Sequence, residues 1–223
     1  MPPPSPPPRG RFTIVYLIHE SFRRDLGRLH NAVSAPGIDQ TRAARLQAHW
    51  TFVDEQLHHH HQVEDASLWP LVRPKLAGQD DKLEILDQME AQHHALEPKC
   101  QAIGEGFTTL VAEPSAAHGA DLAARILAAS DALDSHLSDE EEHCFPVLDA
   151  ALSEDEFASF GKATAKAIGM KGSAKFFPWI FDGASPVERT AVLSMPPPPV
   201  RILSTYVWEP RYTKETAKLW ASV

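Results

Sequence analysis

Features that mark several other classes of protein are scarce in this chain of 223 residues. It has only two cysteines, Cys100 and Cys144, which are too few for a disulfide scaffold and typical of a reducing compartment. The longest apolar run near the N-terminus covers residues 14–18. A secretory signal needs roughly 7–15 apolar residues and a membrane span roughly 20. We therefore expect a cytoplasmic protein that makes no membrane contact.

Positive charge and strand signals are scarce as well. The 21 Lys and Arg residues are outnumbered by 30 Asp and Glu residues, which gives a formal net charge of −9. An acidic protein repels a phosphate backbone, so we expect no nucleic-acid partner. Alternating β-branched runs joined by Asn-Gly turns are missing, which argues against a sheet-based fold.

The sequence has instead four long segments with helical periodicity. In each segment the seam residues recur at spacings of three and four, as expected for the buried face of packed helices. This pattern predicts an all-α fold with an up-down-up-down four-helix bundle. The seam positions are Val15, His19, Phe22, Leu26, Leu29 and Val33, then Leu46, Trp50, Val53, Leu57, His60, Glu64 and Leu68, then Leu86, Met89, His93, Leu96, Cys100 and Ile103, and finally Leu122, Ile126, Ala129, Leu133, His136, Glu140 and Val147.

Proline and capping residues set the expected boundaries. Six of the 19 prolines lie within residues 2–8, so residues 1–11 are expected to form a disordered Pro-rich tail. The bundle is assigned to 12–150, and 151–223 to a C-terminal helical extension packed on it. Within the bundle, Asp80 or Asp81 is expected to cap the third helix, Gly104 and Gly106 to end it, and Ser115 to cap the fourth.

Polar residues interrupt all four seams. The periodicity selects His19, His60, Glu64, His93, His136 and Glu140. A single core histidine is ordinarily a hydrogen-bonded structural residue, but a buried carboxylate without a partner costs several kcal/mol to desolvate. Six such groups on facing helices are therefore best explained as ligands of a metal centre. Imidazole and carboxylate ligands suit iron and, less selectively, manganese or zinc.

A weak internal repeat arranges these residues symmetrically. His60 with Glu64 recurs 76 residues later as His136 with Glu140, and Trp69-Pro70 recurs as Phe145-Pro146. Within each pair the two residues lie one helical turn apart on the same face. Two helical hairpins, each contributing His and His-x3-Glu, are expected to build two equivalent half-sites. We therefore predict two metal ions.

This pattern resembles the hemerythrin-like (HHE cation-binding) family over about residues 12–150. The similarity is carried by the six seam residues, by the phrase His61-Gln62-Val63-Glu64-Asp65, and by Glu140-Glu141 followed by Phe-Pro. The oxygen carriers of the family have a second histidine four residues after the first on the third helix, where this chain has Glu97. It therefore resembles the six-ligand bacterial branch more than the five-histidine carriers.

The resemblance implies two iron ions joined by an oxo or hydroxo bridge. With six protein ligands, about two coordination positions stay open, which favours reaction with a small oxidant such as hydrogen peroxide, O2 or NO. Peroxide decomposition, a catalase- or peroxidase-like activity, is the leading hypothesis. The alternative is a non-catalytic module that binds or senses O2, NO or iron, and a third hypothesis is a zinc or purely structural bundle. The sequence does not indicate an oligomeric state.

Other residues near the seams receive secondary assignments. Candidate second-shell groups are His61, His94, Glu97 and His143, with Glu97 either facing solvent or supplying a third carboxylate. His30, His49 and His118 lie too far along their helices to be ligands. Cys100 and Cys144 are expected to be small core residues, about 22 Å apart and thus unable to form a disulfide.

Overall fold

The computed structural model describes residues 9–220, and this part of the chain is helical without a strand. It divides into two compact units. One contains the described residues up to Phe22 together with Ala163–Lys218, and the other contains Arg23–Lys162 together with Leu219 and Trp220. The predicted Pro-rich tail falls mostly on residues 1–8, which lie outside the described residues. The expected packing of residues 151–223 on the bundle stays a prediction.

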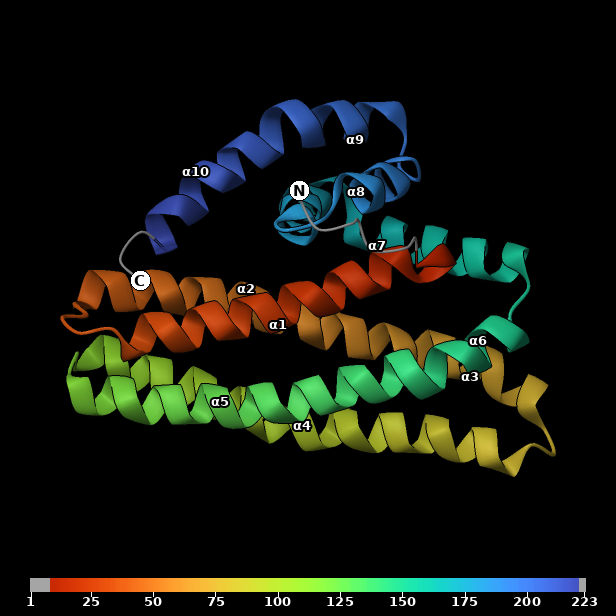
Figure 1. The fold of residues 1–223 in the computed structure, drawn as a ribbon, viewed down its shortest axis with the longest axis horizontal. Coiled ribbons are helices and arrows are strands. Elements are labelled where there is room, and N and C mark those ends of the chain that lie inside the picture. Colours follow the sequence, from red (N-terminus) through yellow and green to blue (C-terminus); the bar gives the residue numbers. More distant parts are fainter. Residues whose placement is uncertain (1–8, 221–223) are drawn as a thin grey trace, which may run out of the picture. The chain divides into compact units, whose positions relative to one another are not determined.

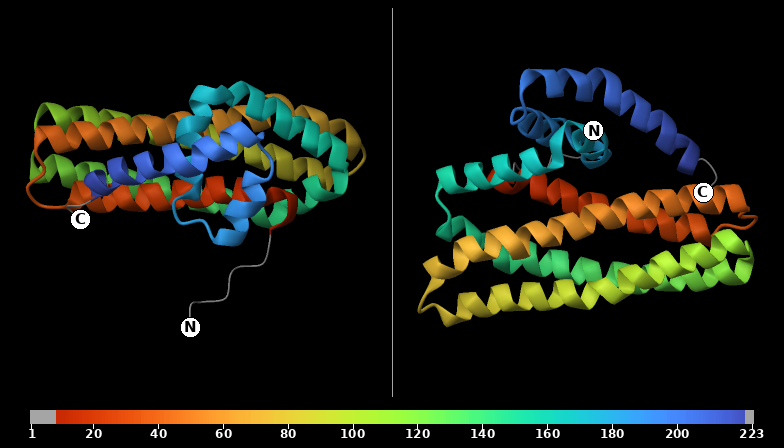
Figure 2. Two further views of the ribbon diagram at one scale, coloured as in Figure 1. Left: turned by 90° about the horizontal axis from the view of Figure 1, so that it is seen from above. Right: turned by 180° about the vertical axis from the view of Figure 1, so that it is seen from behind.

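Long helices form the bundle, as the seam periodicity predicts. They are α1 (Thr13–Ser34), α2 (Gln40–Val63), α4 (Asp80–Ala112) and α5 (Ala116–Asp139). Figure 1 shows successive helices running in opposite directions, and α4 packs against both α2 and α5. The view from behind in Figure 2 shows the same three helices side by side. From Arg23 onward, α1 joins this unit, where the Arg23 guanidinium contacts Asp134 of α5 at 2.6 Å.

Two of the bundle helices continue through irregular turns. After α2 come a π-helical turn, η2 (Glu64–Leu68), the short helix α3 (Trp69–Val72) and the 3-10 turn η3 (Arg73–Leu76). After α5 come a second π-helical turn, η4 (Glu140–Cys144), and α6 (Phe145–Ala151). The repeat noted in the sequence is therefore also a structural repeat.

The predicted seams form the core. Nearly all of their apolar members are buried, and Leu46, Val53, Leu86, Ile103 and Leu122 are fully excluded from solvent. Val15 and Cys100 are only partly buried. The single wide apolar stripe on each helix explains the bundle, because four such stripes remove the most apolar surface from water when they face one another.

The ends of α4 differ from the sequence prediction. Gln79 is the N-cap, and neither Asp80 nor Asp81 caps the helix, although both lie in its first turn, where negative charge is favourable. The helix continues past Gly104 and Gly106 to Ala112. Gly106 packs closely on α5, because a Cβ atom there would lie 2.9 Å from Leu122 Cδ1 and the leucine side chain would have to shift. Ser115 caps α5 as predicted, accepting a hydrogen bond from the His118 amide at 3.1 Å.

The remaining helices contribute mainly to the other unit. They are η1 (Gly10–Phe12), α7 (Glu154–Phe181), α8 (Pro186–Leu193), α9 (Pro198–Leu203), the π-helical turn η5 (Ser204–Trp208) and α10 (Glu209–Trp220). Gly169 interrupts α7 with φ of 62°, a conformation that glycine adopts without strain. Trp179 packs against Phe22 with ring centroids 5.2 Å apart. No described helix is long and apolar enough to cross a bilayer.

A close approach between α5 and α1 depends on one glycine. A Cβ atom on Gly119 would lie 2.6 Å from the carbonyl oxygen of Val33, closer than any real contact. The atom it would meet belongs to the backbone and cannot rotate away. The absence of a side chain at Gly119 therefore sets the spacing of the two helices.

Replacing Gly119 with alanine is expected to destabilise the protein by about 1–3 kcal/mol, because the helices must separate or bend. The control is Gly27→Ala, in the middle of α1, where a Cβ atom would meet nothing within 4 Å. That substitution is expected to stabilise the protein by about 0.5–1 kcal/mol through helix propensity. Urea unfolding of both variants measures the difference, and equal stability would contradict the close contact.

A buried ion-pair network links α1 to α2. Asp25 is fully excluded from solvent, and its carboxylate lies 2.8 Å from both Arg24 Nε and His49 Nε2. Burial alone would raise the pKa of Asp25, but the hydrogen bond from His49 and the charge of Arg24 outweigh it and lower the pKa from 3.8 to about 2. Asp25 is therefore ionised throughout the neutral range, and His49 has a structural partner.

The network predicts a defined loss of stability in acid. Because the folded pKa of Asp25 lies below its unfolded value, its contribution is complete above about pH 4 and disappears as the pH falls towards about 2. We expect the unfolding free energy of Asp25→Asn to depend less steeply on pH in this window than that of the wild type. Asp131→Asn, an exposed position on α5, is the control. Parallel curves for all three proteins would refute the assignment.

Candidate metal centre

The two π-helical turns position the two glutamates. Glu64 and Glu140 are the first residues of η2 and η4, and each accepts a backbone hydrogen bond from the residue five positions later, Trp69 and Phe145 respectively. The next residue is proline in both cases, Pro70 and Pro146, which has no N–H to continue an α-helical ladder. The wide turn accommodates this loss, and π-helical turns inside α-helices are frequent at functional sites.

Three histidine rings from three helices converge beside these glutamates. Ring nitrogens of His61 on α2, His93 on α4 and His136 on α5 all lie within 4.8 Å of one another, and all three residues are buried. His61 stacks on His93 with ring centroids 4.0 Å apart, and His136 stands edge-on to His93 at 4.7 Å. Such a buried group of nitrogen donors has the composition of a transition-metal site.

His60 and the two glutamates extend this group. His60 Nδ1 lies 3.3 Å from Glu64 Oε1, and His60 and Glu140 offer ligand atoms within 4.8 Å of each other. On the other side, His93 Nε2 lies 3.5 Å from Glu64 Oε2. Glu64 therefore stands between His60 and His93, which are ligand candidates on different helices.

The remaining predicted ligand, His19, belongs to the N-terminal part of α1. Its side chain is fully buried, as its seam position requires. It is assigned to the compact unit that ends at Phe22, whereas the other five predicted ligands belong to the bundle unit. Its role as a ligand stays a prediction from the sequence.

Asp65 and Gln92 hold the rings of His93 and His136 in their orientation. Asp65 Oδ1 accepts hydrogen bonds from His93 Nδ1 at 2.9 Å and from Trp69 Nε1 at 3.0 Å. Gln92 Oε1 lies 3.0 Å from His136 Nδ1, while its amide nitrogen donates to Asp139. Because a carboxylate accepts hydrogen bonds, this contact favours the tautomer of His93 with its proton on Nδ1, which leaves Nε2 to face a cation.

The electrostatic surroundings of Glu64 suit the binding of a cation. Burial raises the pKa of Glu64 well above its ordinary value, and the negative charges of Glu140 and Asp65 raise it further. Neither Glu64 Oε2 nor His93 Nε2 has a hydrogen-bond partner in the described part of the chain, and both atoms are buried. A divalent cation would neutralise the carboxylates and satisfy these atoms, so the residues fit the ligand set of a metal site.

The four residues predicted to lie around the ligands occupy different environments. His61 lies inside the cluster, whereas His94, Glu97 and His143 are exposed, with the first two side chains 69% and 67% accessible. Glu97 thus faces solvent. The residue pattern predicted no role for Asp65 or Gln92. The only indication in the sequence was that Asp65 follows Glu64 and Gln92 precedes His93.

The three histidines set aside in the sequence have other partners. His49 pairs with Asp25, His30 Nδ1 lies 3.4 Å from Asn31, and His118 Nδ1 lies 2.7 Å from the carbonyl oxygen of Glu113 at the end of α4. These contacts are local or structural. They explain histidine at these positions without a metal ion.

Both cysteines are free thiols in buried or partly buried positions. Burial raises the pKa of Cys100 to about 12, and the charge of Asp54 adds to the effect. Burial also raises the pKa of Cys144, with smaller contributions from Glu140 and Glu64. A thiol that stays protonated is a poor nucleophile, so both residues behave as small core side chains.

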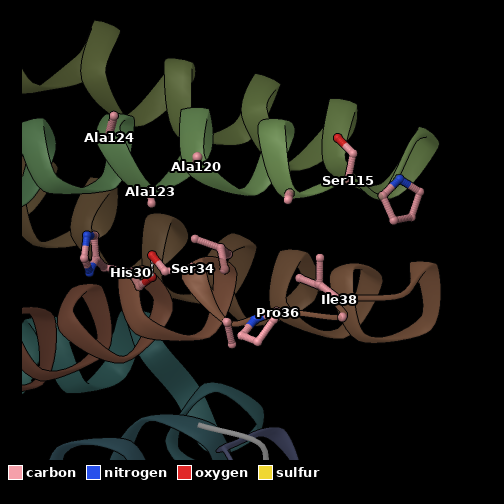
Figure 3. A pocket seen from close by; sticks show the side chains of 13 residues that line it. His30, Ser34, Pro36, Ile38, Ser115, Ala120, Ala123 and Ala124 are labelled. Carbon is pink, nitrogen blue, oxygen red and sulfur yellow. Dashed lines mark hydrogen bonds between the residues drawn. The ribbon is translucent and has the colours of Figure 1, made fainter.

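A pocket of about 640 Å³ lies at the loop end of the bundle, between the α1–α2 and α4–α5 connections. Figure 3 shows the small side chains of Ala120, Ala123 and Ala124 on one side and His30, Ser34 and Pro36 on the other. Its lining contains no carboxylate and a single histidine. The pocket therefore lacks the donor set of the metal centre.

Comparison with known families agrees with this geometry. The model of the hemerythrin HHE cation-binding domain matches residues 12–148, which includes all six predicted ligands and both π-helical turns. The chain belongs to the hemerythrin HHE cation-binding family. No curated protein and no solved structure is detectably similar to it.

Removing the carboxylate that orients His93 is expected to weaken metal binding. Asp65→Ala should lower the affinity about 10–100-fold, because the ring loses both its fixed orientation and the basicity that the carboxylate confers. Asp65→Asn keeps an oxygen acceptor but loses the charge, so its effect should be smaller. Competition with a chromophoric chelator measures the affinity, with Asp131→Ala as the surface control. Wild-type affinity in Asp65→Ala would contradict this role.

Proposed function

We propose that this protein is a non-haem di-iron protein that decomposes hydrogen peroxide. The proposed ligands are His19, His60, Glu64, His93, His136 and Glu140, which corresponds to the six-ligand bacterial branch of the family. The observation that carries the proposal is the buried cluster of histidines around two adjacent carboxylates, of which Glu64 is held at a raised pKa. The proposed partner is the small oxidant itself, with neither nucleic acid nor membrane involved.

The donor set favours iron over the alternatives. Mixed imidazole and carboxylate ligands suit iron and manganese, whereas structural zinc sites are built mainly from cysteine and histidine in closed tetrahedra. Neither cysteine belongs to the buried histidine and glutamate groups. Two carboxylates on opposite helices, each next to histidines, can hold two cations in one site.

The reaction is redox-balanced without a further substrate. One peroxide molecule is oxidised to O2, a second is reduced to two water molecules, and bound iron supplies the reversible electron transfer. The chain's own residues hold the site in place. Asp65 keeps the proton of His93 on Nδ1, and Gln92 holds the His136 ring by its Nδ1. Because the site is buried, only small molecules can reach it.

The alternative is a non-catalytic module that binds or senses O2, NO or iron. It uses the same ligands and the same buried site, and it differs only in the absence of turnover. The structural features that favour metal binding favour both hypotheses equally. Oxygen evolution from peroxide by the iron-loaded protein separates them, because a binding module gives a spectral change without sustained oxygen release.

Loss of either repeated histidine is expected to remove iron and peroxide decomposition together. His60→Ala and His136→Ala should each lower the iron content from about two per chain to one or fewer, because each removes a direct ligand. Oxygen evolution should fall at least about 100-fold, because the proposed reaction uses both metal ions of the site. Elemental analysis and an oxygen electrode measure the two quantities.

The matched control is His58→Ala, which lies in the same histidine run but is exposed. It should retain the iron and the activity of the wild type. Equal iron loss at His58 would show that the helical register is wrong. Purification of the untagged protein with one zinc ion per chain would overturn the di-iron proposal. Two iron ions without oxygen evolution would favour the binding module.

A further inference from the structure

We infer that His61 is a seventh protein ligand, which gives one of the two metal positions three imidazoles and makes the half-sites unequal. This inference rests on the proposed metal centre and deepens it. The six predicted ligands come from an internal repeat, and the repeat pairs His60 with His136. His61 breaks that symmetry, because the equivalent position in the second half is Leu137.

The placement of His61 follows from the face of α2 on which it lies. His61 follows Leu57 by four residues and precedes Glu64 by three, and all three side chains are buried. The buried stripe of an amphipathic helix is wider than a single a/d seam, so two neighbouring positions can both face inward. His60 lies at one border of the stripe with 10% of its side chain exposed, and it contacts Glu64.

The contacts of His61 are with histidines of two other helices. Its ring is stacked on His93, at an interplanar angle of 11°, and stands edge-on to His136 with centroids 5.3 Å apart. Their ring nitrogens lie within 4.8 Å of one another. His93 and His136 are each held at Nδ1 by Asp65 and Gln92, which leaves Nε2 as the nitrogen available to a cation. Ring nitrogens of all three residues thus lie together in one buried cluster.

This third imidazole has a chemical consequence for the site. A further nitrogen ligand fills one of the roughly two coordination positions that a six-ligand di-iron centre leaves open. About one exchangeable position would then remain. It would lie on the metal ion that His61 does not bind. His61 would therefore control how many small molecules the centre can hold at once.

Two substitutions separate coordination from packing. His61→Phe keeps a ring of similar size stacked on His93 but has no nitrogen, whereas His61→Ala opens a cavity in the same place. If His61 is a ligand, both variants should bind the weaker of the two iron ions at least about tenfold less tightly. His58→Ala, exposed and three residues away, should match the wild type. Iron per chain is measured by elemental analysis after competition with a chelator.

Exogenous imidazole provides a second readout. It should restore the lost iron in His61→Ala, where the cavity can admit it, and fail to do so in His61→Phe. Two tightly bound iron ions in His61→Phe would overturn the inference and assign the residue to packing alone. Circular dichroism confirms that each variant is folded. A wild type that holds two iron ions without evolving oxygen would refute the proposed reaction but leave this metal-binding test intact.

Discussion

Burial of histidines and carboxylates in a helical core is the constraint on which the rest of this structure depends. Such groups lose several kcal/mol of hydration when they leave water, and neighbouring carboxylates repel each other as well. The protein keeps Glu64 and Glu140 side by side nonetheless, and burial together with their mutual repulsion raises the pKa of Glu64. A bound cation would reverse both penalties, and its binding would then be thermodynamically linked to folding of the bundle.

The two π-helical turns show how a regular bundle accommodates this demand. Each begins at a buried glutamate, Glu64 or Glu140, and ends before an aromatic-proline pair, Trp69-Pro70 or Phe145-Pro146. Proline removes the hydrogen bond that a uniform α-helix would need, and the turn widens by one residue. The extra residue lets the helix present a glutamate to the core without displacing the apolar residues that follow it. The two π-helical turns thereby place the glutamates in the buried cluster.

Much of this architecture could be predicted from residue spacing. The seams predicted the four long helices, and Ser115 was correctly predicted to cap α5, because periodicity and capping are local properties of the chain. Gly104 and Gly106 were wrongly predicted to end the third helix, since the close contact of Gly106 with Leu122 is tertiary and cannot be read from the local sequence. The place of His61 in the cluster, and the roles of Asp65 and Gln92, depend on contacts between helices that spacing along one helix does not encode.

The hydrogen bond from Trp69 to Asp65 connects the candidate metal centre to an intrinsic fluorophore. The indole N–H and the His93 imidazole share the same carboxylate oxygen, so any change in the charge at the centre alters the local field around the indole. Trp69 is almost fully buried, and its emission therefore responds little to solvent. A cation bound beside His93 is therefore expected to change the emission of this one tryptophan among the five of the chain.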